Sequence, residues 1–338
     1  MKRLLVIVAL IGAACGGSST NKVTLLTHDS FAVSDDVLAT FTQETGISVE
    51  VLRAGDGGAM LNRAILTKDN PLADVIFGID NSLLARALDQ GILDTYEPVL
   101  LRDVPDELEA GTEGRAIPID FGDVCINYDV GHLGEIGQAR PESMDELLAP
   151  EFEGLLVVED PSISSPGLAF LLATIDEYGE QGWQDYWRAL VANDVRVSAG
   201  WEEAYYSAFS YHGGDRPLVV SYASSPPAEV IFAEEPLVTA PTGVLTDSCY
   251  RQVEYAAVLK GTNATEAARQ FIDFMLGVEF QQDIPLNMFV FPANEQAALP
   301  ADFVKHTTLP SEPRLLDPDF VGANRDAWIA EWASIVLR

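Results

Sequence analysis

The stretch GWEEAYY at residues 200–206 brings three aromatic rings and two carboxylates together within seven residues. Aromatic faces attract cations by about 0.5–2 kcal/mol per contact, and carboxylates supply the opposite charge. The stretch can therefore form one wall of a site for a flat, positively charged ligand. The neighbours Tyr205 and Tyr206 also allow a second chemistry, because two phenolates can bind a ferric ion. Neighbouring side chains on a regular helix point about 100° apart, so both can face one metal only near a helix end or break.

Four further stretches with polar or aromatic side chains lie where predicted strands end. They are THDSF (27–31), GDGG (55–58), DPSISSPGLAFLL (160–172) and SYASSP (221–226). In the third stretch Ser164 or Ser165 can cap a helix with Pro166 in its first turn, and free N–H groups there would suit an anion. Each stretch alone is typical of a turn or a helix cap. Their shared position at the carboxyl ends of strands favours a ligand site.

The strands and helices that must position these residues alternate along the chain, which predicts an α/β fold with parallel strands. We expect strands at 23–27, 47–52, 73–78, 154–160, 195–199, 217–223 and 255–259. We expect helices at 34–46, 59–68, 81–91, 142–149, 166–178, 181–193, 201–211, 264–276 and 322–337. Strand material at 117–130, broken at Gly122, is expected to cross into an inserted lobe. The predicted lobes are 23–120 with 242–338, and 121–241, with a ligand cleft between them.

The N-terminus MKRLLVIVALIGAACGGSSTNK is typical of a processing signal. Its apolar run is shorter than the roughly 20 residues that a membrane-spanning helix needs. We expect residues 1–14 to be a lipoprotein signal peptide, Cys15 to carry the lipid, and 15–22 to be a tether. Plain secretion with cleavage near Ala14 is the alternative. Both interpretations place the protein outside the cytoplasm, and the first anchors it to the membrane.

The chain is strongly acidic, with 20 basic and 52 acidic residues. Removal of Lys2 and Arg3 with the signal leaves 18 basic residues, so 18 minus 52 gives a mature net charge of −34. This charge excludes nucleic acid as a partner, because phosphates would be repelled. It is compatible with a cationic ligand, but a solvated acidic surface suited to a saline habitat explains it equally well.

Motifs of common enzymes are absent: the sequence has no GxSxG, HExxH, CxxC or GxxxxGK[ST]. The four histidines are scattered without metal-ligand spacing. We therefore expect no catalytic residues, no metal site and no cofactor. An extracytoplasmic two-lobed α/β protein of this kind is predicted to be a solute-binding protein.

Cys125 and Cys249 are the cysteines that remain once Cys15 is set aside. Outside the cell they could pair. Two unpaired buried thiols fit the sequence equally well, so the sequence leaves the choice open.

The chain resembles the thiamine-binding proteins of bacterial ABC importers, within the type II periplasmic binding proteins. The resemblance rests on THDSF, GDGGAMLNRA, ADVIFGIDNSLL, IDFGDVCINYD, DPSISSPGLAFLL, GWEEAY, SYASSP, IPLNMFVFP and AWIAEW, in this order over about residues 23–335. It implies a monomer whose two lobes close on thiamine, or on thiamine mono- or diphosphate. It also implies that the closed protein delivers the ligand to an ABC transporter permease and needs no cofactor.

Carried over position by position, the family's stacking rings fall on Trp201 and Tyr222, its glycine-turn acid on Asp56 and its helix-start serine on Ser164. The ligand-binding residues that we expect are His28, Asp29, Ser30, Asp56, Asp120, Ser164, Ser165, Trp201, Tyr205, Tyr222, Ser225, Asn287 and Phe289. The chain departs from the family where tyrosine, tryptophan and a further tyrosine can stand. The residues there are His28, Phe289 and Ala228.

Two alternatives to a thiamine carrier stay open at this point. One is a ferric-ion-binding protein of the same superfamily that uses Tyr205 and Tyr206. The other is an extracytoplasmic enzyme or sensor domain for an organic cation, and a different organic solute is also compatible. Within GWEEAYY we expect Trp201 and Tyr205 to face the cleft, Tyr206 to pack, and the two glutamates to be solvated.

Overall fold

The computed structural model describes residues 21–337. Within them nine strands form one mixed sheet in the order β2-β1-β3-β8-β4-β7-β5-β6, with β9 paired to β4. The strands are β1 (Lys22–Thr27), β2 (Ser48–Arg53), β3 (Val75–Asp80), β4 (Ile117–Asp129), β5 (Leu156–Glu159), β6 (Arg196–Ser198), β7 (Leu218–Tyr222), β8 (Thr242–Val258) and β9 (Phe291–Pro292). The predicted signal peptide, Cys15 and most of the tether lie outside the described residues.

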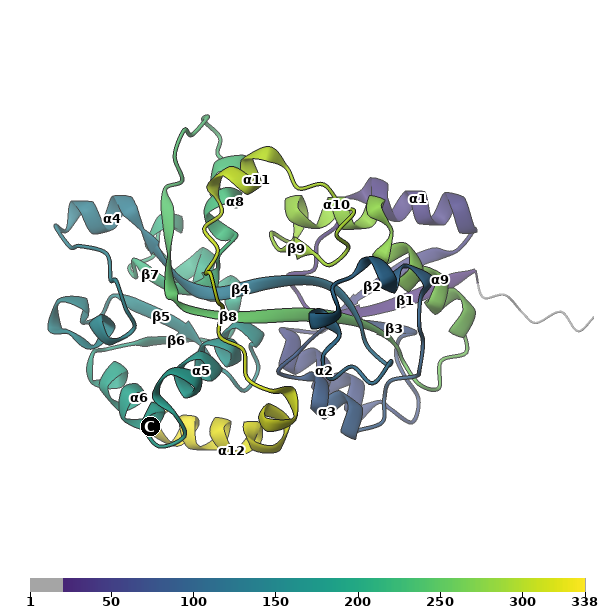
Figure 1. Cartoon of the computed structure of the whole chain (residues 1–338), viewed down its shortest axis with the longest axis horizontal. Helices are drawn as coiled ribbons and strands as arrows, with labels where there is room; N and C mark the ends of the chain where they lie inside the picture. The colour runs from purple at the N-terminus through teal and green to yellow at the C-terminus, as the bar shows by residue number, and fades with distance from the viewer. Residues whose placement is uncertain (1–20, 338) are drawn as a thin grey trace, which may run out of the picture.

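Two long antiparallel strands, β4 and β8, run across the whole molecule and connect two lobes (Figure 1). The parallel strands β1, β2 and β3 belong to the first lobe, and β5, β6 and β7 to the second. The lobe boundary predicted at 120/121 falls inside β4, which contributes to both lobes. The boundaries therefore remain a prediction, whereas the α/β class is confirmed.

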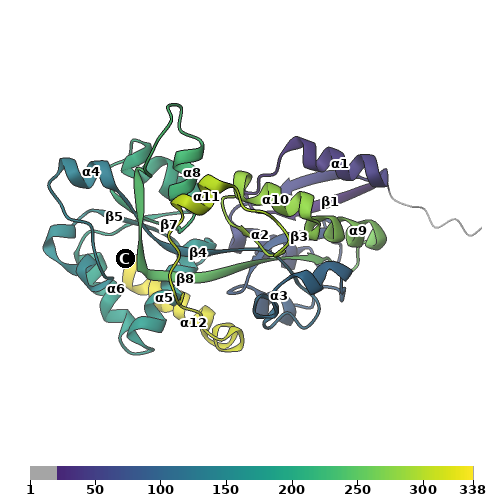
Figure 2. The same ribbon diagram turned by 45° about the horizontal axis from the view of Figure 1, so that its top comes forward.

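Helices cover both faces of the sheet (Figures 1 and 2). They are α1 (Asp35–Thr45), α2 (Gly57–Leu66), α3 (Leu84–Asp89), α4 (Val130–Glu135), α5 (Ser165–Tyr178), α6 (Trp183–Ala192), α7 (Trp201–Glu203), α8 (Ser225–Ile231), α9 (Thr265–Leu276), α10 (Val278–Asn287), α11 (Ala301–His306) and α12 (Pro318–Val336). The C-terminal α12 contacts α3 of the first lobe and α6 of the second. Trp332 of α12 meets Trp187 of α6 edge to face at 5.5 Å.

Local signals explain where α1 begins and ends and where α5 begins. The Ser34 side chain accepts a hydrogen bond from the Val37 N–H, and Gly46 ends α1 in a left-handed conformation, as the sequence predicts. Ser164 caps α5 by accepting from the Gly167 N–H at 3.4 Å. These caps satisfy backbone groups that a helix end leaves unpaired.

Three expectations about regular structure are wrong. The helix expected at 142–149 is only a 3-10 turn at Asp145–Leu148. The strand at 117–130 is not broken at Gly122, because β4 continues through it in register with β8. A Cβ on Gly122 would lie 3.0 Å from Cδ1 of Tyr222, so this glycine serves the packing of that ring rather than a break. The helix expected at 201–211 consists of α7, a π turn at Ala204–Ala208 and a 3-10 turn at Ser210–His212.

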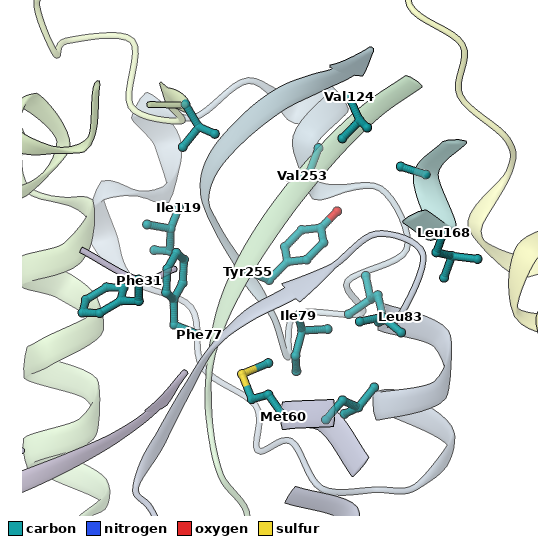
Figure 3. Close-up of a cluster of buried hydrophobic side chains, with 14 of the residues drawn as sticks. Phe31, Met60, Phe77, Ile79, Leu83, Ile119, Val124, Leu168, Val253 and Tyr255 are labelled. Atoms are coloured by element: carbon teal, nitrogen blue, oxygen red, sulfur yellow. The ribbon is translucent and has the colours of Figure 1, made fainter. Parts of the chain in front are cut away.

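The core of the first lobe holds the loop after β1 and the start of α2 in place (Figure 3). Phe31, Met60, Phe77 and Tyr255 are almost fully buried and come from the loop after β1, from α2, from β3 and from β8. Phe31 meets Phe77 edge to face with ring centroids 5.6 Å apart. Each such side chain contributes roughly 1.5–3 kcal/mol of hydrophobic stabilisation. Packing thus fixes the ends of β1 and β3 against the start of α2.

Cys125 of β4 and Cys249 of β8 form a disulfide, with their Cα atoms 4.2 Å apart. The sequence left this pairing open. The bond joins the two strands that connect the lobes, on the second-lobe side of the sheet. Within residues 21–337, no helix is both long and apolar enough to cross a membrane.

Candidate ligand-binding site

A cavity of about 540 Å³ lies between the two lobes, and this volume is within the range of small-molecule sites. Eleven of the thirteen predicted ligand-binding residues line it: His28, Asp29, Ser30, Asp56, Ser165, Trp201, Tyr205, Tyr222, Ser225, Asn287 and Phe289. The four stretches at strand ends and GWEEAYY therefore do meet in space. Their role in binding a ligand stays a prediction.

Two predicted residues do not line the cavity. Ser164 is buried as the cap of α5, so its oxygen is used inside the protein. Asp120 is buried in β4 behind the cavity wall. Ser165, next to the cap, does line the cavity.

The loops after β1 and β2 form one wall of the cavity and support each other. The Asp29 carboxylate accepts from the Gly55 N–H at 3.0 Å, and the Asp29 N–H donates to the Gly55 carbonyl, also at 3.0 Å. Asp56 caps α2 by accepting from the Gly57 N–H at 2.7 Å. Asp29 thus braces the glycine-rich turn that presents Asp56.

The glycine-rich turn also lets the two lobes touch. A Cβ on Gly57 would collide with the Ser165 hydroxyl of the second lobe. The N–H of Gly58 donates to the carbonyl of Ile163 at 3.1 Å, and the Trp201 N–H donates to Asp56 at 3.4 Å. The glycines of this turn thus let the backbone approach the opposite lobe. The lobes are therefore in a closed arrangement.

Aromatic rings form the opposite wall. Trp201 stacks on Tyr205 with ring centroids 5.0 Å apart and an angle of 16°, and it meets Tyr222 edge-on at 6.4 Å. The Trp201 indole N–H donates to Ser221 at 2.9 Å, and the Ser221 hydroxyl contacts the Ser225 hydroxyl, also at 2.9 Å. These bonds fix the orientation of the indole beside the cavity.

Tyr206 was expected to pack in the protein, and this is wrong. The π turn places Tyr205 inside, 3% exposed, while Tyr206 is 48% exposed and lines the cavity with its ring perpendicular to that of Tyr205. The extra residue in a π turn shifts the side chains out of helical phase, which sequence periodicity cannot predict. Glu202 is exposed as expected, but it also borders the cavity.

The sequence did not reveal a polar cluster around Glu229 of α8. The Tyr205 hydroxyl donates to Glu229 Oε1 at 2.6 Å, and His212 Nε2 lies 3.0 Å from the same oxygen. Glu229 and His212 both line the cavity. The spacing of Ser225 and Glu229, four residues apart on one helix face, is the signal that could have found this acid.

A second missed acid, Glu254, lies on β8 and lines the cavity. His28 Nε2 is 3.8 Å from its carboxylate. Burial raises the pKa of Glu254, and the positive field of His28 opposes that rise. Gln252 and Glu254 stand two residues apart on one face of β8, just before the apolar end YAAV, and this spacing is the sequence signal for a side of β8 that faces the cavity.

The loop after α10 closes the cavity from the first lobe. Phe289 has a positive φ of 57°, an unfavourable conformation for a non-glycine residue that is frequent at functional sites. Its carbonyl accepts a bond from the Ser224 hydroxyl, and its ring meets Phe232 edge to face at 5.3 Å. Phe289 therefore links this loop to α8 of the second lobe.

The charge of the cavity wall is one-sided. Five carboxylates line it, and no lysine or arginine is among the described lining residues: Asp29, Asp56, Glu202, Glu229 and Glu254. Rings and carboxylates together favour a flat organic cation, because each cation–ring contact gains most where water is excluded.

Ferric binding would require phenolates at Tyr205 and Tyr206. Burial raises the pKa of Tyr205 well above its ordinary value, and the neighbouring Glu229 raises it further. Burial and Glu229 also raise the pKa of Tyr206. The protonated Tyr205 hydroxyl donates a hydrogen bond to Glu229. Tyr205 and Tyr206 are therefore poorly prepared to bind a metal as phenolates. Within residues 21–337, no three histidine, cysteine or acidic side chains gather where they could hold a metal ion.

The chain belongs to the bacterial extracellular solute-binding proteins, whose family model matches residues 70–312. Membership confirms the predicted class and its extracytoplasmic setting. The chain is 31% identical over 320 residues to the thiamine-binding periplasmic protein of Escherichia coli (strain K12), covering 94% of each chain. A solved structure of a periplasmic thiamin binding protein is similar with a TM-score of 0.81 and 29% identity, covering 94% of this chain and 96% of that one. This similarity confirms the two-lobed periplasmic-binding-protein fold.

A more distant relative is named for iron. The iron uptake protein A1 of Synechocystis sp. is 25% identical over 311 residues, covering 85% of this chain and 81% of that protein. The identity is lower and the coverage smaller than for the thiamine-binding relative from Escherichia coli.

Proposed function

We propose that this protein binds thiamine between its two lobes and delivers it to the permease of an ABC transporter. One observation carries the proposal: a cavity between the lobes whose wall combines stacked rings with five carboxylates and, among the described residues, no lysine or arginine. The thiazolium ring of thiamine has a fixed positive charge and a flat face, and its aminopyrimidine offers hydrogen-bond donors. The relatives named for thiamine support the same ligand.

The protein acts as a carrier, and no catalytic step is part of the proposal. Opening must separate the contacts between Gly58 and Ile163, between Trp201 and Asp56, and between Phe289 and the second lobe. Thiamine then enters, and the lobes close on it by hinge motion. The closed form docks on the permease as a monomer tethered by a lipid at Cys15.

Calorimetric titration with thiamine tests the proposed function. We expect a single site with a dissociation constant below the micromolar range. Absence of binding at micromolar protein and ligand concentrations would overturn the proposal. Titration with the mono- and diphosphate compares the three forms of the vitamin. In parallel, a visible charge-transfer band on addition of ferric citrate would point to the iron alternative, since a thiamine complex is colourless.

A further inference from the structure

Three carboxyl groups lie side by side on adjacent strands beneath the cavity. Glu254 of β8 is in register with Asp80 of β3 on one side and with Asp120 of β4 on the other. Directly opposed residues of an antiparallel pair project to the same face, about 4.5–5.5 Å apart. Glu254 reaches the cavity, while Asp120 lies behind it. The row therefore connects the ligand site to the interior of the sheet.

The three acids differ in their hydrogen-bond partners. Asp80 accepts from the Ser82 N–H at 2.8 Å, the Leu83 N–H at 3.1 Å and the Ser82 hydroxyl. Asp120 is 0% exposed, and neither of its oxygens has a donor group in reach among the described residues. Glu254 is its neighbour across the strand pair, and two carboxyls can hydrogen-bond to each other only through a proton.

The surroundings of Glu254 are mostly acidic. The titratable groups that face it are His28 from the loop after β1, Asp56 at the start of α2, Asp80, Asp120 and the Tyr222 hydroxyl from β7. On its own strand the Gln252 amide donates to it at 3.3 Å. Two adjacent negative charges in a buried site are costly, as in other carboxyl pairs that share a site.

We propose that Glu254 and Asp120 share one proton in the empty site, and that the positive charge of a bound ligand displaces this proton to solvent. The O–H bond of the shared carboxyl breaks, the proton passes to the buffer, and the cation takes its place beside Glu254. The charge inside the site is thus the same before and after binding. The inference rests on the proposed function only for the choice of ligand.

The pKa shifts have the direction that this exchange requires. Burial, followed by the negative charge of Glu254, raises the pKa of Asp120 well above its ordinary value. Burial also raises the pKa of Glu254. A cation beside the pair favours the ionised form and lowers both. Binding then releases protons, so affinity rises with pH, by up to about tenfold per pH unit for one whole proton. It levels off above the pKa of the empty pair.

The experiment is calorimetric titration with thiamine near neutral pH in two buffers with different ionisation enthalpies. The slope of the observed enthalpy against the buffer's ionisation enthalpy gives the number of protons released. For the wild-type protein we expect between about one half and one proton. Glu254→Gln and Asp120→Asn should each reduce the number to near zero, and Glu254→Gln should also weaken binding about tenfold or more.

Glu159→Gln is the matched control. Glu159 is also a fully buried carboxyl without a hydrogen-bond partner and with a raised pKa, but it does not line the cavity. This variant should keep the wild-type proton number. Loss of proton release in Glu159→Gln alone would overturn the assignment to the Glu254–Asp120 pair.

Two further outcomes separate this inference from the proposed function. Tight thiamine binding with no proton release refutes the shared proton and leaves the thiamine carrier intact. No thiamine binding refutes the carrier. If a variant does not fold, infrared difference spectroscopy of the wild type provides the answer. The carbonyl band of a protonated carboxylic acid must disappear on binding, and an unchanged band would overturn the inference.

Discussion

Replacement of Trp201 tests whether the ring wall binds the ligand. The indole is half-buried beside the cavity, stacked on Tyr205 and hydrogen-bonded through its N–H to Ser221 at 2.9 Å. A partly desolvated cation–ring contact contributes about 1–2 kcal/mol and ring stacking about 0.5–1.5 kcal/mol. Trp201→Ala removes both, so about 1.5–3.5 kcal/mol is lost. Since 1.4 kcal/mol corresponds to a tenfold change in the dissociation constant, thiamine affinity should decrease by a factor between about ten and several hundred.

Trp201→Phe separates the two contributions of the indole. Phenylalanine keeps an aromatic face but loses the bond to Ser221, a neutral hydrogen bond of about 0.5–1.5 kcal/mol. We therefore expect a loss of about two- to tenfold, clearly smaller than for Trp201→Ala. If both variants lose equally, the hydrogen bond or the fold explains the effect rather than the ring face.

Tryptophan fluorescence and calorimetry together make the assay specific. The chain has five tryptophans, and Trp201 is the one that lines the cavity. Thiamine should quench wild-type fluorescence, and the quenching should be largely lost in Trp201→Phe even though calorimetry still detects binding. Unchanged melting temperatures control for folding. Wild-type affinity and quenching in Trp201→Ala would refute the ring wall.

Four other variants test the charge and the framework around the cavity. Glu229→Gln should weaken thiamine binding by about 5- to 30-fold in calorimetry, because a charge-assisted contact of about 1–2 kcal/mol is lost. Glu202→Gln at the exposed rim should change the affinity less than about threefold in the same measurement. Equal effects of the two substitutions would contradict a specific role for Glu229. The double variant Cys125→Ser/Cys249→Ser should lower the free energy of unfolding by about 2–5 kcal/mol in denaturant titrations, and wild-type protein in reductant should match it. Burial and then the charge of Asp56 raise the pKa of Glu159. The contribution of Glu159 to stability is therefore full below the pKa of the unfolded chain, about 4.3, and is lost as pH rises through the pKa of the folded protein. The melting temperature of Glu159→Gln should thus rise relative to that of the wild type between pH 4.5 and pH 8, and parallel pH curves would show that Glu159 is ionised in the folded protein.

Local sequence signals were sufficient for the framework of this protein. Caps such as Ser34 and Gly46 mark real helix ends because the signal and its effect lie within a few residues. Strand ends brought the predicted loops together because parallel strands share one edge. The break predicted at Gly122 failed for the opposite reason, since its cause is the Tyr222 ring packed on it from another strand.

The acids that shape the cavity could not be selected from the sequence alone. In a chain with 52 acidic residues, the spacings Ser225–Glu229 and Gln252–Glu254 are signals too weak to single out these two acids. Their importance arises from contacts over long sequence distances, such as Tyr205 with Glu229 and His28 with Glu254. Likewise the π turn that brings Tyr206 to the cavity depends on tertiary packing rather than on periodicity.

The acidic composition and the acidic cavity are therefore separate features with different physical effects. Exposed carboxylates are screened by water and salt, so they contribute little to the binding of one particular cation. Glu254 and Asp120 are 9% and 0% exposed, and their repulsion is not screened in this way. A cation that enters the cavity relieves this repulsion, while the same cation on the outer surface gains little. Burial of a few acids can thus confer selectivity that a net charge of −32, spread over the chain, does not.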